Sequence, residues 1–190
     1  MELDQTTYND LSVFHHEEEF SIFNKLDFTR TGEGRDWLYR FFKSPFSDLK
    51  LINETQQILR LIGKNEGEWP MAISNGTIMV IAKFYETGID TIPSSGSMMD
   101  ALSYKIFHGP DFSLVRYSMT HFSDFLLGMK KMVELFDNDD SPPLLRRFIS
   151  RCKDLLGRSI ADEMINRTGG KEFSYTETIY FGRRIRHDYK

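Results

Sequence analysis

The chain has 190 residues, of which 40% are hydrophobic and 27% are charged, and its formal net charge is −4. This length suits one domain, or a domain with an extension, and the composition is typical of a soluble globular protein. The negative charge argues against nucleic-acid binding by the chain as a whole, and the single cysteine, Cys152, excludes an intrachain disulfide and a multi-cysteine zinc site. We expect a reducing, cytoplasmic location without a signal peptide and without a membrane-spanning segment.

The charge is unevenly distributed along the chain. Residues 146–190 carry eleven Lys and Arg against six Asp and Glu, so this segment has a net charge of +5. The preceding 145 residues carry thirteen basic and twenty-two acidic residues, for a net charge of −9. A basic end on an acidic body indicates either a partner that is a polyanion or a solvated helix face. Three residues are candidates for a DNA-facing or partner-facing surface: Arg183, Arg184 and Arg186.

The first predicted helix starts near Gly32, with Thr31 as its N-cap, and stops at Ser44-Pro45, because the residue before proline avoids helical angles. A second helix is expected over 48–62, where Gly63 suits the position just past its end. Apolar residues at helical spacing predict further helices over 76–86 and 97–107, the latter with Ser97 and Asp100 in a spacing like that of a capping box.

The most regular pattern lies between residues 112 and 136. Its apolar residues are spaced 4, 3, 4, 3, 4 and 3 apart: Val115, Met119, Phe122, Leu126, Met129, Val133 and Phe136. Such a heptad seam predicts a long helix packed nearly parallel or antiparallel to its neighbours, with this stripe in the core. Another long helix is expected over 144–165, with Cys152 on its buried stripe, and the alternation over 173–181 indicates a short extended segment. These elements predict an all-α, multi-helix bundle with long antiparallel helices.

No catalytic set is evident in the sequence. The stretch TGEGRDW at 31–37 lacks the lysine and hydroxyl of a phosphate-binding loop, and it has no third glycine for a dinucleotide fingerprint. His15 and His16 stand beside three glutamates, but adjacent histidines usually point apart, so a metal site there is the weakest of the hypotheses. We therefore expect no catalytic, cofactor-binding or metal-binding residues in this chain.

Two segments carry a more specific pattern. The first reads L-D-x-x-T-x-x-[ND]-L-x-[LV], matched by Leu3, Asp4, Thr7, Asp10, Leu11 and Val13. The second reads L-D-x-T-x-T-x-x-G-x-R-x-L, with a serine before it and an aromatic turn, a proline and an Ile/Gln helix after it. Its matches are Ser21, Leu26, Asp27, Thr29, Thr31, Gly34, Leu38, Pro45, Asp48, Ile52 and Gln56, while Arg35 stands one position before the arginine of the pattern. Together they resemble the opening of the core domain of MutS, the DNA mismatch-repair ATPase family. Gly32-Glu33 replaces the usual Pro-Met, and Thr55 replaces the usual Arg.

The resemblance implies a MutS-like core domain over 1–190, with an opening segment at 1–25, a core bundle at 26–140, and a lever-type helix with the basic end at 141–190. It implies a mechanical role, in which long helices couple the nucleotide state of an ATPase domain to DNA binding. We expect that ATPase domain, with its ATP and Mg²⁺, to follow Lys190. The implied partners are double-stranded DNA, the chain's own ATPase domain and a second copy in the full-length protein. The structural motif residues are Asp27, Thr29, Thr31, Gly34, Arg35 and Pro45.

Two alternatives to this non-catalytic repair module remain at this stage. One is a helical protein-interaction scaffold with no role in DNA or ATP binding, which the acidic body and the absent catalytic set favour. The other is a metal-dependent enzyme site around His15 and His16.

Two residues of the second segment have expected structural roles. Arg35 is expected to fix the first turn of its helix through a carboxylate, for which Asp27 is one candidate. Gly34 is expected to allow close approach of that turn to a neighbour.

Overall fold

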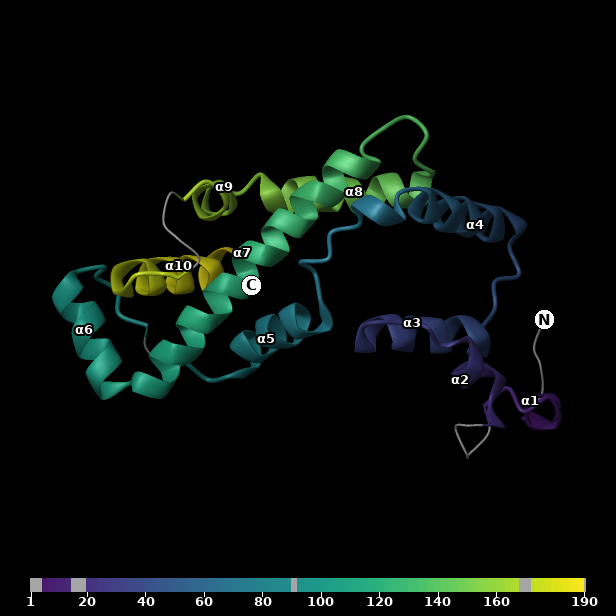
Figure 1. Ribbon diagram of the computed structural model, residues 1–190, viewed down its shortest axis with the longest axis horizontal. Coiled ribbons are helices and arrows are strands. Elements are labelled where there is room, and N and C mark those ends of the chain that lie inside the picture. The colour runs from purple at the N-terminus through teal and green to yellow at the C-terminus, as the bar shows by residue number, and fades with distance from the viewer. Residues whose placement is uncertain (1–4, 15–19, 90–91, 168–171, 190) are drawn as a thin grey trace. The chain divides into compact units, whose positions relative to one another are not determined.

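The computed structural model describes residues 5–14, 20–89, 92–167 and 172–189, and all regular secondary structure in these ranges is helical (Figure 1). The all-α prediction is therefore confirmed for the described residues. The chain divides into two compact units, Met1–Arg60 and Leu61–Lys190. Leu3, Asp4 and the histidine pair of the metal hypothesis lie outside the described residues.

The first unit is formed by short helices and has few buried side chains. Its helices are α1 (Gln5–Asp10), α2 (Ile22–Leu26), α3 (Gly32–Lys43) and most of α4 (Leu49–Lys64). Phe23 of α2 is its buried aromatic residue, and the rings of Tyr39 and Phe42 from α3 lie 5.6 and 5.7 Å from it. Trp37 and Phe41 of the same helix are exposed. The expected stop of α4 before Gly63 is wrong, since the helix continues to Lys64.

The second unit holds the main hydrophobic core. Its elements are the 3₁₀ turn η2 (Glu66–Glu68) and the helices α5 (Asn75–Glu86), α6 (Met98–Phe107), α7 (Gly109–Phe136), α8 (Pro143–Leu156), α9 (Ser159–Ile165) and α10 (Tyr175–Asp188). The predicted long helix is confirmed as α7, which packs against each of the five other α-helices of this unit. Its seam is buried as expected, apart from the half-buried Val133.

The helix predicted over 144–165 is broken in two. α8 ends at Leu156, Gly157 caps it, and Arg158 adopts extended angles before α9 begins at Ser159. The break falls at a glycine, which has low helix propensity. The guanidinium of Arg158 lies 4.4 Å from the centre of the Tyr189 ring, and this contact stabilises the extended residue between the two helices. The buried position of Cys152 on α8 is confirmed, and burial raises the pKa of its thiol.

The extended segment predicted over 173–181 is also wrong, because most of it belongs to α10. Ser174 caps this helix through a complete capping box: its hydroxyl accepts from the Glu177 amide, and the Glu177 carboxylate accepts from the Ser174 amide. Such reciprocal bonds satisfy two of the free amide donors at a helix start. They outweigh the period-two pattern of side chains that suggested a strand.

The capping box predicts an acid-sensitive contribution to stability. Burial opposes ionisation of Glu177, but the Ser174 amide and hydroxyl and the Arg167 guanidinium outweigh it, so the pKa is lowered from its ordinary 4.5. A carboxyl with a lowered folded-state pKa stabilises the fold above its ordinary pKa, and this contribution is lost as pH falls through the folded value. We expect Glu177→Gln to reduce the difference in urea midpoint between about pH 7 and about pH 3. An unchanged difference would contradict this role.

Candidate functional site

The motif residues of the first unit meet in one local network around the start of α3. One carboxylate oxygen of Asp27 accepts from the Thr29 amide at 3.1 Å and from its hydroxyl at 2.5 Å. The other oxygen lies 3.0 Å from Nε of Arg35. The predicted pairing of Arg35 with Asp27 is therefore confirmed. These contacts lower the pKa of Asp27, with the Thr29 hydroxyl as the largest cause.

The next residues of the motif complete the helix start. The Thr31 hydroxyl accepts from the Gly34 amide at 3.0 Å, so Thr31 is the N-cap as predicted. A β-carbon added at Gly34 would lie 2.9 Å from the Thr31 hydroxyl oxygen and 3.6 Å from Cβ of Thr29, which explains the glycine at this position. Ser44 caps the other end of α3, immediately before Pro45. The groups of this network bond to one another and fix the first turn of α3.

Replacing the cap tests this part of the structure. Thr31→Ala leaves the Gly34 amide without its acceptor, and we expect a loss of about 1 kcal/mol in the stability of α3. Thr31→Ser, which keeps the hydroxyl, is the matched control. Hydrogen exchange of the α3 backbone amides measures the effect within the first unit, and equal protection in the two variants would contradict it.

Replacing Arg35 tests the ion pair. Arg35→Ala is expected to lower the thermal midpoint of the chain, because it removes the partner of Asp27 and the guanidinium that lies 5.7 Å from the Phe23 ring. Unchanged thermal stability combined with a lost nucleotide affinity would contradict the structural role and favour a phosphate site.

The candidate basic surface lies on α10, and each of its arginines has partners within the second unit. Arg186 donates to the backbone oxygens of Ile89 and Thr87 at 3.0 and 2.9 Å, and Arg183 donates to that of Ser94. These bonds hold α10 against the segment between α5 and α6. Because two of its N–H donors already bond to backbone oxygens, Arg186 has fewer donors left for a phosphate group. This geometry favours a structural role for Arg186 over a role in DNA binding.

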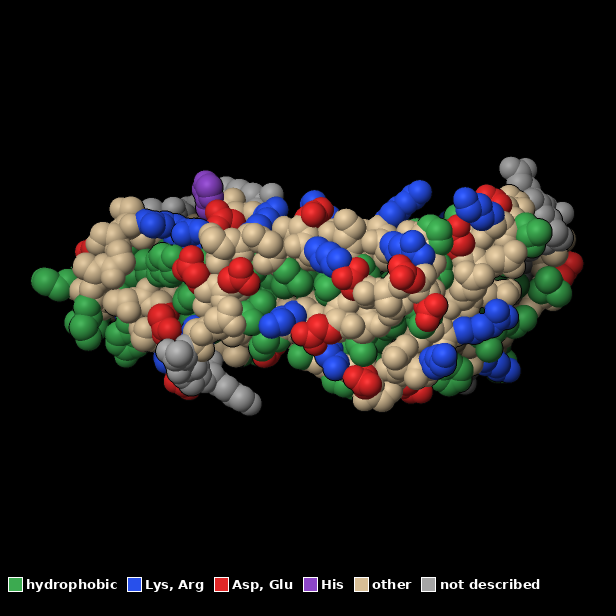
Figure 2. Space-filling view, turned by 90° about the horizontal axis from the view of Figure 1, so that it is seen from above, with side chains coloured by type: hydrophobic (Ala, Val, Ile, Leu, Met, Phe, Trp, Pro, Cys, Tyr) green, Lys and Arg blue, Asp and Glu red, His purple; other side chains and the backbone are tan. Residues whose placement is uncertain are grey.

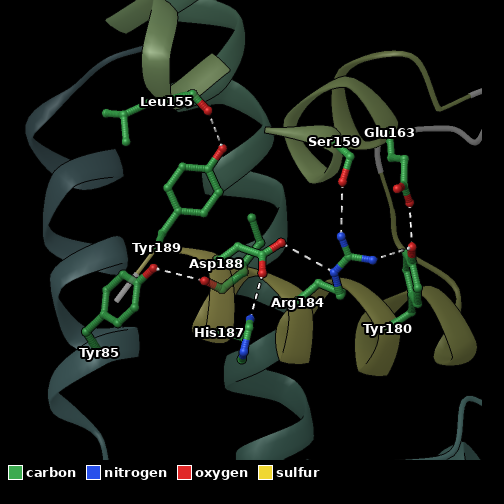
Figure 3. A network of polar contacts seen from close by, with 10 residues as sticks. Tyr85, Leu155, Ser159, Glu163, Tyr180, Arg184, His187, Asp188 and Tyr189 are labelled. Carbon is green, nitrogen blue, oxygen red and sulfur yellow. Dashed lines mark hydrogen bonds and ion pairs between the residues drawn. The ribbon is translucent and has the colours of Figure 1, made fainter. Parts of the chain in front are cut away.

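Arg184 is the centre of a polar network at the end of α10 (Figure 3). Its guanidinium donates to Ser159 at 3.1 Å and lies 3.3 Å from the Asp188 carboxylate, and a further N–H reaches the Tyr180 hydroxyl at 3.4 Å. Tyr180 in turn donates to Glu163 at 2.5 Å. The network joins α10 to α9, and Tyr189 extends it to α8 through a 2.8 Å bond to the Leu155 backbone oxygen. Asp188 pairs with Arg184 and Glu163 bonds to Tyr180, so negative charge accompanies this arginine within the network.

A cleft of about 280 Å³ opens in the second unit beside α7. Lys105 of α6 and Arg116 of α7 are among its lining residues, together with Glu172 and Tyr117. Lys105 donates to the Tyr175 hydroxyl at 2.5 Å, and this contact is the largest cause of the lowered pKa of Tyr175. Sequence reasoning missed this group, because its members are up to 70 residues apart and come together only through the packing of α6, α7 and α10.

The described residues hold no group of three or more His, Cys, Asp or Glu side chains placed to bind a metal ion. Among the helices that the structure describes, none combines the length and the apolar character needed to cross a membrane. Comparisons with protein-family models, with curated proteins and with solved structures find no match.

Proposed function

We propose that the chain is the non-catalytic core module of a MutS-like, ATP-driven DNA-binding protein. The observation that carries the proposal is the network around the start of α3. Asp27, Thr29 and Arg35 bond to one another, and Thr31 bonds to Gly34. Asp27, Thr29, Thr31 and Gly34, which match the family pattern, and Arg35 beside them therefore act together in one turn, and this supports their interpretation as one motif.

The mechanical part of the proposal rests on α7. Coupling between distant sites needs a stiff element with discrete arrangements. α7 runs over 28 residues with a buried seam, and it contacts α5, α6, α8, α9 and α10. A shift of this helix would be transmitted to every other α-helix of the second unit. α7 is accordingly the lever candidate, and α8, which packs along it, is the second.

The partners follow from this role. ATP and Mg²⁺ would bind in an ATPase domain outside these 190 residues, and double-stranded DNA and a second copy of the protein would engage the full-length molecule. The gene sequence beyond Lys190 tests this part directly. We expect a Walker A lysine motif within about the next hundred residues. Its absence would contradict the proposal.

The second candidate is a helical interaction scaffold, and a specific observation favours it. The outward side of α6 exposes large apolar side chains, among them Met99, Ile106 and Phe107. A scaffold of this kind would bind no duplex DNA even at low salt, where phosphate contacts are strongest. Salt-sensitive duplex binding that is lost on replacement of Arg183, Arg184 and Arg186, in a variant whose thermal midpoint is unchanged, would exclude the scaffold and support the repair-type module.

A further inference from the structure

Helix α6 is apolar on two opposite sides. Its inner side buries Ala101 and Tyr104 against Phe112 of α7 and Ile179 of α10. Its outer side carries large apolar side chains with exposed fractions from 48% to 83%, which we call the α6 face: Met98, Met99, Leu102, Ile106 and Phe107. Apolar side chains accordingly gather at the surface on the left of Figure 2, the side on which α6 lies in Figure 1.

The α6 face has the pattern of a binding stripe. Met99, Leu102 and Ile106 follow one another at spacings of three and four, so they lie along one line of the helix. Contiguous exposed apolar patches on soluble proteins usually mark interaction sites. Methionine side chains adapt to different partners because they are unbranched and flexible. The outer side of α6 therefore offers an apolar stripe against which another helix can pack.

A positive edge borders this face. Lys105 belongs to the same helix and reaches the Tyr175 phenol, with its ammonium 4.4 Å from the centre of that ring. No carboxylate among the described side chains forms a salt bridge with Lys105, and its hydrogen-bond partner is a hydroxyl. Behind it the cleft of about 280 Å³ holds Arg116, whose guanidinium donates to the Phe173 backbone oxygen at 2.8 Å.

The carboxylates near α6 belong to Glu172, Asp100 and Asp111, the last of which adds to the effect of burial in raising the pKa of Tyr104. Arg116 also pairs with Glu172 at 2.9 Å, but that carboxylate is 87% exposed and a partner's carboxylate could compete with it. Asp100, on the other side of α6, is engaged by the hydroxyls of Ser95 and Ser97. An incoming chain therefore meets an apolar stripe with two cations along one of its edges, Lys105 and the Arg116 that is paired with Glu172.

We propose that the α6 face and its Lys105–Arg116 edge bind an amphipathic helix that carries acidic side chains along one edge of its apolar stripe. Recognition would be by packing of one helix against another, in which spaced apolar side chains give affinity and the charged edge fixes orientation. A membrane surface is a poorer fit, because attraction to anionic lipid needs clusters of about four to eight basic residues. This inference is independent of the proposed repair role.

Two designed helical peptides of about 18 residues test it. Both have the same leucine stripe, one with glutamates along its edge and the other with lysines at the same positions. We expect the chain to bind the glutamate peptide about fivefold more tightly, as measured by fluorescence anisotropy, with a preference that weakens as salt is raised. Equal affinity for the two peptides, or no binding of either up to about 1 mM, would overturn the proposal.

Variants of the chain identify the surface. Leu102→Glu with Ile106→Glu is expected to abolish binding of the glutamate peptide, and both side chains are exposed, so the fold should be retained. Lys105→Glu should reverse the preference in favour of the lysine peptide. The matched controls on α7 are Leu127→Glu and Lys130→Glu, which are exposed and outside the α6 face. If the control variants lose peptide binding equally, the α6 face is not the binding surface. Binding of the α6 face to anionic lipid vesicles without binding of either peptide would also contradict the proposal.

Discussion

Replacing Phe84 with alanine is expected to lower the free energy of unfolding of the second unit by about 3 to 5 kcal/mol. The Phe84 side chain is fully buried, and its ring lies 5.7 Å from that of Phe122 and 5.4 Å from that of Tyr85. Arg186 also holds its guanidinium 5.8 Å from this ring. Truncation removes apolar contacts between α5 and α7 and leaves a cavity that packed helices cannot readily close.

The effect can be measured by urea unfolding with Trp69 fluorescence in a Trp37→Phe background, since Trp69 lies 6.3 Å from Phe136 in the same unit. Phe148→Ala is the matched control, because this α8 side chain is 48% exposed. We expect the control to lose less than about 1 kcal/mol. Similar losses in the two variants would mean that the core is not where the structure places it.

Replacing Gly182 with valine is expected to cost about 3 kcal/mol, because α10 approaches α7 closely at this glycine. A β-carbon at Gly182 would lie 2.4 Å from Cγ1 of Val115 and 3.5 Å from Cδ1 of Ile92. Val115 is fully buried and its branched side chain has little rotational freedom. The helices must therefore separate to admit the added atoms.

A double-mutant cycle isolates this contact. Gly182→Ala should be tolerated better in a Val115→Ala background, since removal of Cγ1 opens the space that the new methyl group needs, and we expect a coupling of about 1 kcal/mol or more. Gly63→Ala is the matched control, with nothing within 4 Å of the added carbon, and it should be neutral or stabilising. Additive effects of the two substitutions would show that α7 and α10 do not meet at this point.

The sequence predicted best those elements whose signal is either a long regular repeat or a group of neighbouring residues. The seam of α7 repeats for three heptads, and this spacing alone indicates a long helix with one buried stripe. Its tertiary contacts favour the same structure. The start of α3 was predictable because Asp27, Thr29, Thr31 and Arg35 lie within nine residues. The N-cap, the ion pair and the close contact at Gly34 all form between residues that are neighbours along the chain. They could therefore be predicted without a periodic pattern of side chains.

Two elements were predicted wrongly because a weaker signal was given too much importance. Over 173–181 the alternation of side chains favoured a strand, while Ser174 and Glu177 already stood at the spacing of a capping box. In the same way Gly157 was overlooked within a continuous apolar stripe. The cleft with Lys105 and Arg116 had no local signal, since its residues come from helices that are distant in sequence.

The most direct test of the central claim is the affinity of the full-length protein for labelled duplex DNA, measured at low salt with and without ATP. A core module that couples nucleotide state to DNA binding predicts that ATP changes this affinity by about fivefold or more. It also predicts that Gly182→Val, which disturbs the packing of α7, reduces that change at temperatures where the variant is folded. Duplex binding that is absent at low salt, or present and unaffected by ATP, would contradict the account.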